Sequence, residues 1–200
     1  MNQDGVNKGR RRFLGAATTA VGAVGVVGVA VPFVKSWVPS EKAKAVGGPV
    51  KIDLSKLEEG ALLTEEWRGK PIYVLKRSPE VLTALKGDEL KSKLADPESA
   101  DEAQQPGYAK NDTRSVSEEV LVVEGVCTHL GCAPKLHYEV KPEPFDSEWL
   151  GGFFCPCHGS KFDMAGRVFA GVPAPLNLVV PKHSFPDENT LLIGVDQGEA

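Results

Sequence analysis

Two short segments hold all four cysteines of this 200-residue chain and two of its four histidines. They read Cys127-Thr-His129-Leu-Gly-Cys132 and Cys155-Pro-Cys157-His158-Gly-Ser160. Each segment offers one cysteine and one histidine at ligand spacing, and a second cysteine is left over in each. Because thiolate sulfur and imidazole nitrogen bind zinc and iron–sulfur centres, these residues predict a metal site.

The distribution of the ligands bears on the identity of the metal. Zinc fingers place their cysteines in one segment and their histidines in another. Here each segment contributes a mixed pair, Cys127 with His129 and Cys155 with His158. A [2Fe–2S] cluster of Rieske type has two thiolates on one iron and two imidazoles on the other, which two mixed segments can supply. A zinc-stabilised interaction module remains the alternative, and it predicts a colourless protein.

With these two motifs the chain resembles the Rieske iron–sulfur subunits of bacterial cytochrome bc1 complexes. The resemblance covers the N-terminal anchor and roughly residues 120–182, including the proline-rich stretch Gly171-Val-Pro-Ala-Pro175. It implies one [2Fe–2S] cluster and a disulfide between Cys132 and Cys157, which requires an oxidising compartment. The implied cluster ligands are Cys127, His129, Cys155 and His158. The residues expected to tune the cluster are Leu130, Gly131, Ser160, Phe162 and Pro173.

Phe162 departs from the family pattern, which commonly has tyrosine at this position. In the family, the serine and tyrosine hydroxyls both hydrogen-bond to cluster or ligand sulfur. Such hydrogen bonds stabilise the added electron and raise the reduction potential. With Ser160 present and the tyrosine hydroxyl missing, we expect a potential in the lower part of the high-potential Rieske range.

The N-terminal region has the features of an exported membrane anchor. Residues 13–34 carry no charge, and as a helix they would extend about 33 Å, enough to cross a bilayer core. Residues 1–12 contain Lys8 and three arginines, which predicts a cytoplasmic N-terminus. Arg10-Arg11-Arg12-Phe13-Leu14 also matches a twin-arginine export motif. This route carries folded proteins, so the cluster could be inserted before export.

The anchor could be retained or removed. Ala43-Lys-Ala45 resembles a signal-peptidase site, but the apolar run exceeds the usual 7–15-residue signal core. Trp37 follows the run, where an interfacial anchor is expected. We therefore expect a retained transmembrane helix at 13–34, a flexible tether at 35–48 and a soluble domain at 49–200. The cluster-binding subdomain is expected at about residues 124–175.

The soluble domain is predicted to be mainly β, as an antiparallel β-sandwich with a helix-and-loop insertion. Strands are expected at 50–54, 71–75, 120–123, 178–180 and 191–195. Helical spacing predicts a helix over 79–94 with Ser78 as its N-cap. The polar stretch 96–114 is expected to be a surface excursion, and the role of 135–152 is left open. His137 and His183 are expected to be structural or exposed, and Asp163 and Arg167 to form a scaffold pair.

The family resemblance implies electron transfer from quinol to cytochrome c1 as a subunit of quinol–cytochrome c reductase. His129 and His158 are candidate acceptors of the quinol hydrogen bond and proton. The expected partners are cytochromes b and c1, quinol and the membrane, within a dimeric complex. The expected location is the bacterial inner membrane, crossed once, with the domain on the periplasmic side. The net charge of −4, without a basic patch, indicates no nucleic-acid partner.

The alternative function is a soluble or peripheral Rieske electron carrier, such as the small subunit of a periplasmic oxidase, without quinol chemistry. Retention of residues 13–34 separates this alternative from the cytochrome bc1 subunit. A Rieske ferredoxin of an oxygenase system is disfavoured, because such proteins usually lack the two additional cysteines.

Overall fold

The computed structural model describes residues 5, 7–40, 43 and 47–197. The chain divides into two compact units, Met1–Ala45 and Val46–Ala200. Of the segment 41–46, which includes the expected cleavage site at 43–45, only Ala43 is among the described residues. Each unit is therefore considered by itself.

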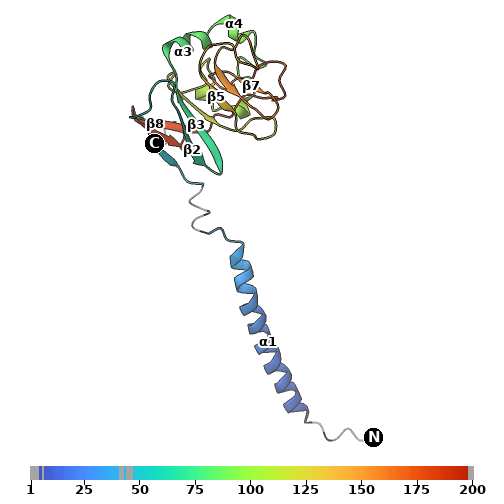
Figure 1. Cartoon of the computed structure of the whole chain (residues 1–200). Helices are drawn as coiled ribbons and strands as arrows, with labels where there is room; N and C mark the ends of the chain where they lie inside the picture. The colour runs from blue at the N-terminus through green and yellow to red at the C-terminus, as the bar shows by residue number, and fades with distance from the viewer. Residues whose placement is uncertain (1–4, 6, 41–42, 44–46, 198–200) are drawn as a thin grey trace. The chain divides into compact units, whose positions relative to one another are not determined.

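The first unit contains one long helix, α1 (Lys8–Ser36) (Figure 1). Asn7 caps it by accepting a hydrogen bond of 3.1 Å from the Arg10 N–H. The helix begins five residues before the uncharged run and ends two residues after it, so Lys35 and Ser36 are helical. It is long and apolar enough to cross a membrane, and none of its residues is buried by protein. An exposed apolar surface of this size marks a site of contact with a membrane or with another protein.

Among its described residues, the second unit contains three antiparallel sheets of three strands each. Strands β2, β3, β5, β7 and β8 are labelled in Figure 1. The first sheet has the order β1–β9–β8, with β1 at Val50–Asp53, β8 at His183–Asp187 and β9 at Thr190–Ile193. The second comprises β2 (Leu62–Trp67), β3 (Lys70–Lys76) and β4 (Val120–Glu124) in sequence order. The third comprises β5 (Lys135–His137), β6 (Gly152–Phe154) and β7 (Lys161–Phe162). The expectation of a mainly β, antiparallel fold is confirmed.

The sheet β2–β3–β4 is covered on both faces, which explains the continuous apolar run of β3. Successive side chains of a strand point to opposite faces. Ile72 and Val74 face a core shared with β1 and β9, which contribute Ile52, Leu191 and Ile193. Tyr73 and Leu75 face the second core, which contains the helices and the third sheet. The third sheet and its loops therefore pack against the sheet β2–β3–β4.

The predicted helix over 79–94 is broken into two short helices, α3 (Pro79–Leu85) and α4 (Asp88–Lys91). Ser78 caps α3 as expected, accepting a hydrogen bond of 3.3 Å from the Val81 N–H. The break falls at Gly87, which has an extended backbone and is the N-cap of α4. Beyond α4 the chain pairs with 168–170 instead, through Ala95 N–H to the Val168 carbonyl at 2.9 Å. A tertiary pairing has replaced the last helical turn.

The expectation of a surface excursion at 96–114 is only partly right, because residues 99, 105, 109, 113 and 114 are buried while the others are exposed or partly exposed. This segment forms two 3₁₀ turns, η1 (Glu102–Gln104) and η2 (Gly107–Ala109), and much of it is packed against the domain. Ala109 and Arg114 are fully buried, and Ser99 is nearly so. The polar composition is misleading because its polar groups are satisfied inside, as when Gln105 Nε2 donates to the Ser99 carbonyl at 3.0 Å.

The strand predicted at 178–180 is also absent from the described residues. The segment is extended, but its backbone hydrogen bonds go to three separate elements. Leu178 donates to Gly166, Val180 donates to Gln104, and Val179 accepts from Glu124 at 2.7 Å. A ladder with one neighbouring strand therefore does not form. Five strands of the described residues were not predicted individually: β2, β5, β6, β7 and β8.

Candidate metal centre

The two cysteine–histidine segments form loops of matching backbone geometry. The first loop follows β4, and the second joins β6 to β7. In the first, the Cys127 N–H donates to the Cys132 carbonyl at 2.8 Å, and the Gly131 N–H donates to the Cys127 carbonyl at 2.9 Å. In the second, the Cys155 N–H donates to the Ser160 carbonyl at 2.8 Å, and the Gly159 N–H returns to Cys155 at 3.0 Å. Each loop thus closes around its first cysteine.

The closing turn needs glycine at the fifth position of each loop. Gly131 has φ of 83° and Gly159 has φ of 79°, a region that other residues rarely adopt. No atom would contact a Cβ at either position. The requirement is therefore for backbone conformation and not for space.

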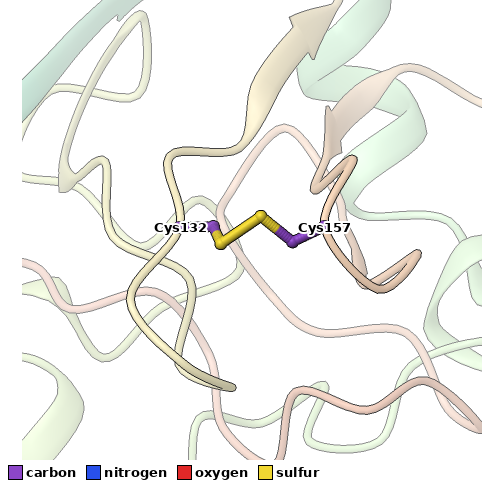
Figure 2. The surroundings of a disulfide bond; sticks show 2 residues. All are labelled: Cys132 and Cys157. Carbon is purple, nitrogen blue, oxygen red and sulfur yellow. A yellow bond between two sulfur atoms is a disulfide. The ribbon is translucent and has the colours of Figure 1, made fainter.

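A disulfide between Cys132 and Cys157 joins the two loops (Figure 2). Its Cα atoms are 6.7 Å apart. The three sulfur atoms of Cys132, Cys155 and Cys157 all lie within 4.8 Å of one another. Two of these sulfurs are bonded to each other and cannot act as thiolate ligands. Among the described cysteines, Cys127 and Cys155 carry free thiols.

The free cysteines, Cys127 and Cys155, are both buried and come from different loops. Burial raises the pKa of the Cys127 thiol, and the adjacent Cys155 thiol raises it further. Hydrogen bonds from the His129 backbone and the Ser160 hydroxyl act in the opposite direction. The buried Cys127 thiol is therefore costly to ionise without a cation, whereas a coordinated metal ion deprotonates a thiol outright.

The two histidines of the loops lie together on the more accessible side. The ring centroids of His129 and His158 are 4.8 Å apart, with planes at 87°. His158 is exposed and His129 is half-buried. The site therefore combines buried sulfur with accessible nitrogen. The apolar side chain of Leu130 is 72% exposed beside His129 in the sequence.

The proline-rich stretch is attached to both loops. The Thr128 hydroxyl donates to the Leu176 carbonyl at 2.6 Å, and the Ala174 N–H donates to the Ser160 hydroxyl oxygen at 3.0 Å. Ser160 is fully buried, while Pro173 is exposed. Sequence reasoning missed Thr128, although its position between two candidate ligands was a usable signal.

Tyr73 contacts the chain on both sides of the first loop, at Gly125 and at Pro134. The Tyr73 hydroxyl donates to the Pro134 carbonyl at 2.9 Å, just beyond Cys132. A Cβ at Gly125 would lie 2.5 Å from the Tyr73 ring, so only glycine allows this approach. The ring also stacks on Phe153 of β6, with centroids 5.8 Å apart. One aromatic residue of β3 thus links both ligand-bearing segments.

Phe162 is fully buried in β7 and belongs to the same apolar core as Cys127 and Cys155. It lies opposite Phe153 in the sheet register. The effect of its missing hydroxyl on the potential stays a prediction.

Below the second loop, a tight turn is organised around Asp163. Its carboxylate accepts the N–H groups of Ala165 and Arg167 at 2.9 and 2.8 Å, and pairs with Arg167 Nε at 2.7 Å. Both side chains are completely buried. The expected scaffold pair is therefore present. Two further arginines, Arg77 and Arg114, donate to the carbonyls of this turn.

The remaining histidines lie outside the ligand loops. His183 is fully buried, with Nδ1 2.8 Å from the Pro181 carbonyl. His137 is half-buried and lies 3.4 Å from the carboxylate of Glu143. The structural role expected for His183 agrees with this burial, and His137 packs against Phe145 with ring centroids 5.0 Å apart.

Comparison with known proteins identifies the class first. The model of the Rieske [2Fe-2S] domain matches residues 101–182, which include both loops and the proline-rich stretch. The chain is therefore a Rieske protein, and its cofactor is a [2Fe–2S] cluster. The donor set fits this cofactor, because two buried thiols and two adjacent imidazoles come from a disulfide-linked pair of loops.

The full-length relatives then define the family. The chain is 56% identical over 200 residues to the ubiquinol–cytochrome c reductase iron–sulfur subunit of Allochromatium vinosum, covering all of this chain and 95% of that protein. It is 41% identical over 185 residues to the same subunit of Blastochloris viridis, covering 92% of each. Residues 1–40 match the model "Ubiquitinol-cytochrome C reductase Fe-S subunit TAT signal". The chain belongs to the family of ubiquinol–cytochrome c reductase iron–sulfur subunits.

Proposed function

We propose that this chain is the electron-transfer subunit of a cytochrome bc1 complex, taking electrons from quinol and passing them to cytochrome c1. The observation that carries the proposal is the pair of matched loops, which bring two buried thiols and two accessible imidazoles together. Membership in the reductase family favours this function over the small subunit of a periplasmic oxidase.

Cys127, His129, Cys155 and His158 are the proposed ligands of the cluster. When bound, the [2Fe–2S] cluster supplies a one-electron redox centre, whose potential is raised by replacing two thiolates with neutral imidazoles. The disulfide and the closing hydrogen bonds hold the two loops at a set separation. Burial of both thiols keeps water from the sulfur side of the site.

The exposed imidazoles support a role in proton transfer. A histidine that binds metal through one ring nitrogen can accept a hydrogen bond and a proton at the other. His158 is exposed and His129 is half-exposed, so a quinol hydroxyl can reach at least one ring. Leu130, which is largely exposed, offers an apolar contact for the pocket in which quinol is held.

The proposed location is the bacterial inner membrane, with α1 crossing it once and the cluster domain in the periplasm. Support comes from the length and apolarity of α1 and from the basic residues that precede its apolar run. The proposed boundaries are a cytoplasmic N-terminus at 1–12, a transmembrane segment at 13–34, a tether at 35–48 and a soluble domain at 49–200. The proposed partners are cytochromes b and c1 in a dimeric complex.

Purification of the tagged full chain from detergent-solubilised membranes tests this function. We expect b-type and c-type haem to co-purify and dithionite-reduced protein to show the low-temperature EPR signal of a Rieske cluster. The Cys155→Ser variant is a matched control, since it removes one proposed ligand and leaves the disulfide cysteines intact. Purification free of haem, or an EPR signal unchanged in this variant, would contradict the proposal.

We also propose that the domain moves on the segment 35–48 between its electron donor and its acceptor. Replacing residues 41–46 with prolines stiffens this segment. We expect slower quinol–cytochrome c turnover with an unchanged midpoint potential. Turnover equal to that of the unmodified chain would refute a moving domain. In a separate experiment, mass spectrometry of the mature N-terminus shows whether the anchor is retained.

A further inference from the structure

Buried charge in the domain is unbalanced in favour of arginine. Arg77, Arg114 and Arg167 are each at most 1% exposed. The buried carboxylates among the described residues are Asp163 and Glu124, and Glu124 pairs with Lys70 at 2.6 Å. Asp163 pairs with Arg167 at 2.7 Å. Two guanidinium groups therefore lie inside the domain without a carboxylate of their own.

Arg77 and Arg114 are held by neutral oxygen atoms. Arg77 donates to the carbonyls of Thr113 and Met164 at 2.8 and 3.1 Å, to the Glu118 carbonyl and to the Ser115 hydroxyl. Arg114 donates to the carbonyls of Gln104, Ala165 and Gly166 and to the side-chain oxygen of Gln105. Its Nε has no partner among the described residues. Such contacts solvate a charge without neutralising it.

Burial lowers the pKa of both Arg77 and Arg114 to about 10, and the charge of Asp163 partly offsets this in each case. Both groups therefore remain protonated at neutral pH. Burying a charge without a counter-charge costs free energy. Because Arg77 and Arg114 both lie in this region without a carboxylate partner of their own, the electrostatic potential there is positive.

This excess of positive charge lies beside β4, which leads into the first ligand loop, and beside the turn that follows β7 after the second loop. A Cβ built at Gly166 would lie 3.3 Å from Arg114 Nη1 and 3.4 Å from Val123 Cγ1. Val123 is four residues before Cys127, a stretch of chain that spans at most about 14 Å. Gly166 is six residues after Ser160, and the turn from Asp163 to Arg167 follows β7 directly. The length of this stretch limits how far the first loop can lie from Arg114, and charges interact more strongly through a protein interior than through water.

We propose that Arg77 and Arg114 are electrostatic positioning residues that raise the reduction potential of the cluster. The added electron makes the centre more negative, and uncompensated positive charge in the core stabilises that state. This inference rests on the proposed cluster site. It assigns a redox role to residues outside the ligand loops, without contact to the metal ligands.

Paired substitutions that separate charge from packing test the inference. Arg114→Lys and Arg114→Met both remove the guanidinium fork, but only the second removes the charge. The midpoint potential of the full-length, cluster-loaded protein is measured by EPR-monitored redox titration at pH 7. We expect a lower potential in Arg114→Met than in Arg114→Lys, and the same order for the corresponding pair at Arg77. Asp163→Asn removes a negative charge and should shift the potential upward.

The methionine variants should lower the midpoint potential and Asp163→Asn should raise it. General structural damage would not produce shifts of opposite sign. Equal potentials in the lysine and methionine variants would overturn it, as would a downward shift in Asp163→Asn. If Arg114→Met fails to retain the cluster, the Arg77 pair and Asp163→Asn decide the question in the same way. A wild-type protein without a Rieske EPR signal would instead refute the proposed function, so the two failures are distinguishable.

Discussion

The ion pair between Asp163 and Arg167 is predicted to be a large contributor to the stability of the domain. Asp163→Asn preserves size and can keep one side-chain oxygen for the N–H groups of Ala165 and Arg167. It removes the charge that pairs with Arg167 at 2.7 Å, where both side chains are 0% exposed. The amide also places a donor against the guanidinium, which has only donors. A buried arginine then loses its counter-charge.

Breaking a buried pair by removing one partner typically costs about 3–5 kcal/mol. The same carboxylate is also the largest favourable charge for Arg77 and Arg114, which places the expected cost in the upper half of that range. For a domain of 150–250 residues, each 1 kcal/mol lowers the unfolding temperature by roughly 2–4 °C. We therefore expect a decrease of about 8–20 °C.

Thermal unfolding followed by circular dichroism on the cluster-loaded chain measures the effect. Glu118→Gln is the matched control, because it neutralises the exposed partner of Lys86 in a pair at 3.0 Å. Exposed pairs contribute about 0–1 kcal/mol, so this control should shift the midpoint by no more than a few degrees. Similar shifts in the two variants would refute the reasoning that burial sets the strength of the Asp163 pair.

Three further predictions concern potential, covalent linkage and pH. Phe162→Tyr should raise the midpoint potential in a redox titration, and no upward shift would refute the assigned effect of the missing hydroxyl. Replacing Cys132 and Cys157 together by serine should destabilise the domain by about 3–4 kcal/mol in urea unfolding, since the disulfide spans 25 residues; an unchanged urea midpoint would contradict this. Burial lowers the pKa of His183 in the folded state, so the unfolded chain binds more protons. Stability should therefore fall as the pH drops below about 6.5, the ordinary histidine value. His183→Gln should weaken the dependence of the urea midpoint on pH in this range. An unchanged dependence would show that other groups cause it.

The ligand loops were predictable from the sequence because their requirements are local. A cysteine followed four residues later by glycine recurs in both loops, and each closes by the same two backbone hydrogen bonds. The uncharged run before Lys35 likewise predicts a helix by composition alone. The ordinary strands β1, β3, β4 and β9 follow from short apolar runs between turn residues. None of these features requires knowledge of a distant partner.

Only the tertiary structure decided where the polar residues lie. Arginine is usually a surface residue. Nothing in the sequence around Arg77, Arg114 or Arg167 indicates that these three side chains are buried. Their carbonyl partners are up to 87 positions away in the chain, as for Arg77 and Met164. The same reason explains why the predicted helix does not extend to residue 94 and why no strand forms at 178–180. Backbone groups bond to whichever segment packs beside them, and that neighbour is set by the whole fold.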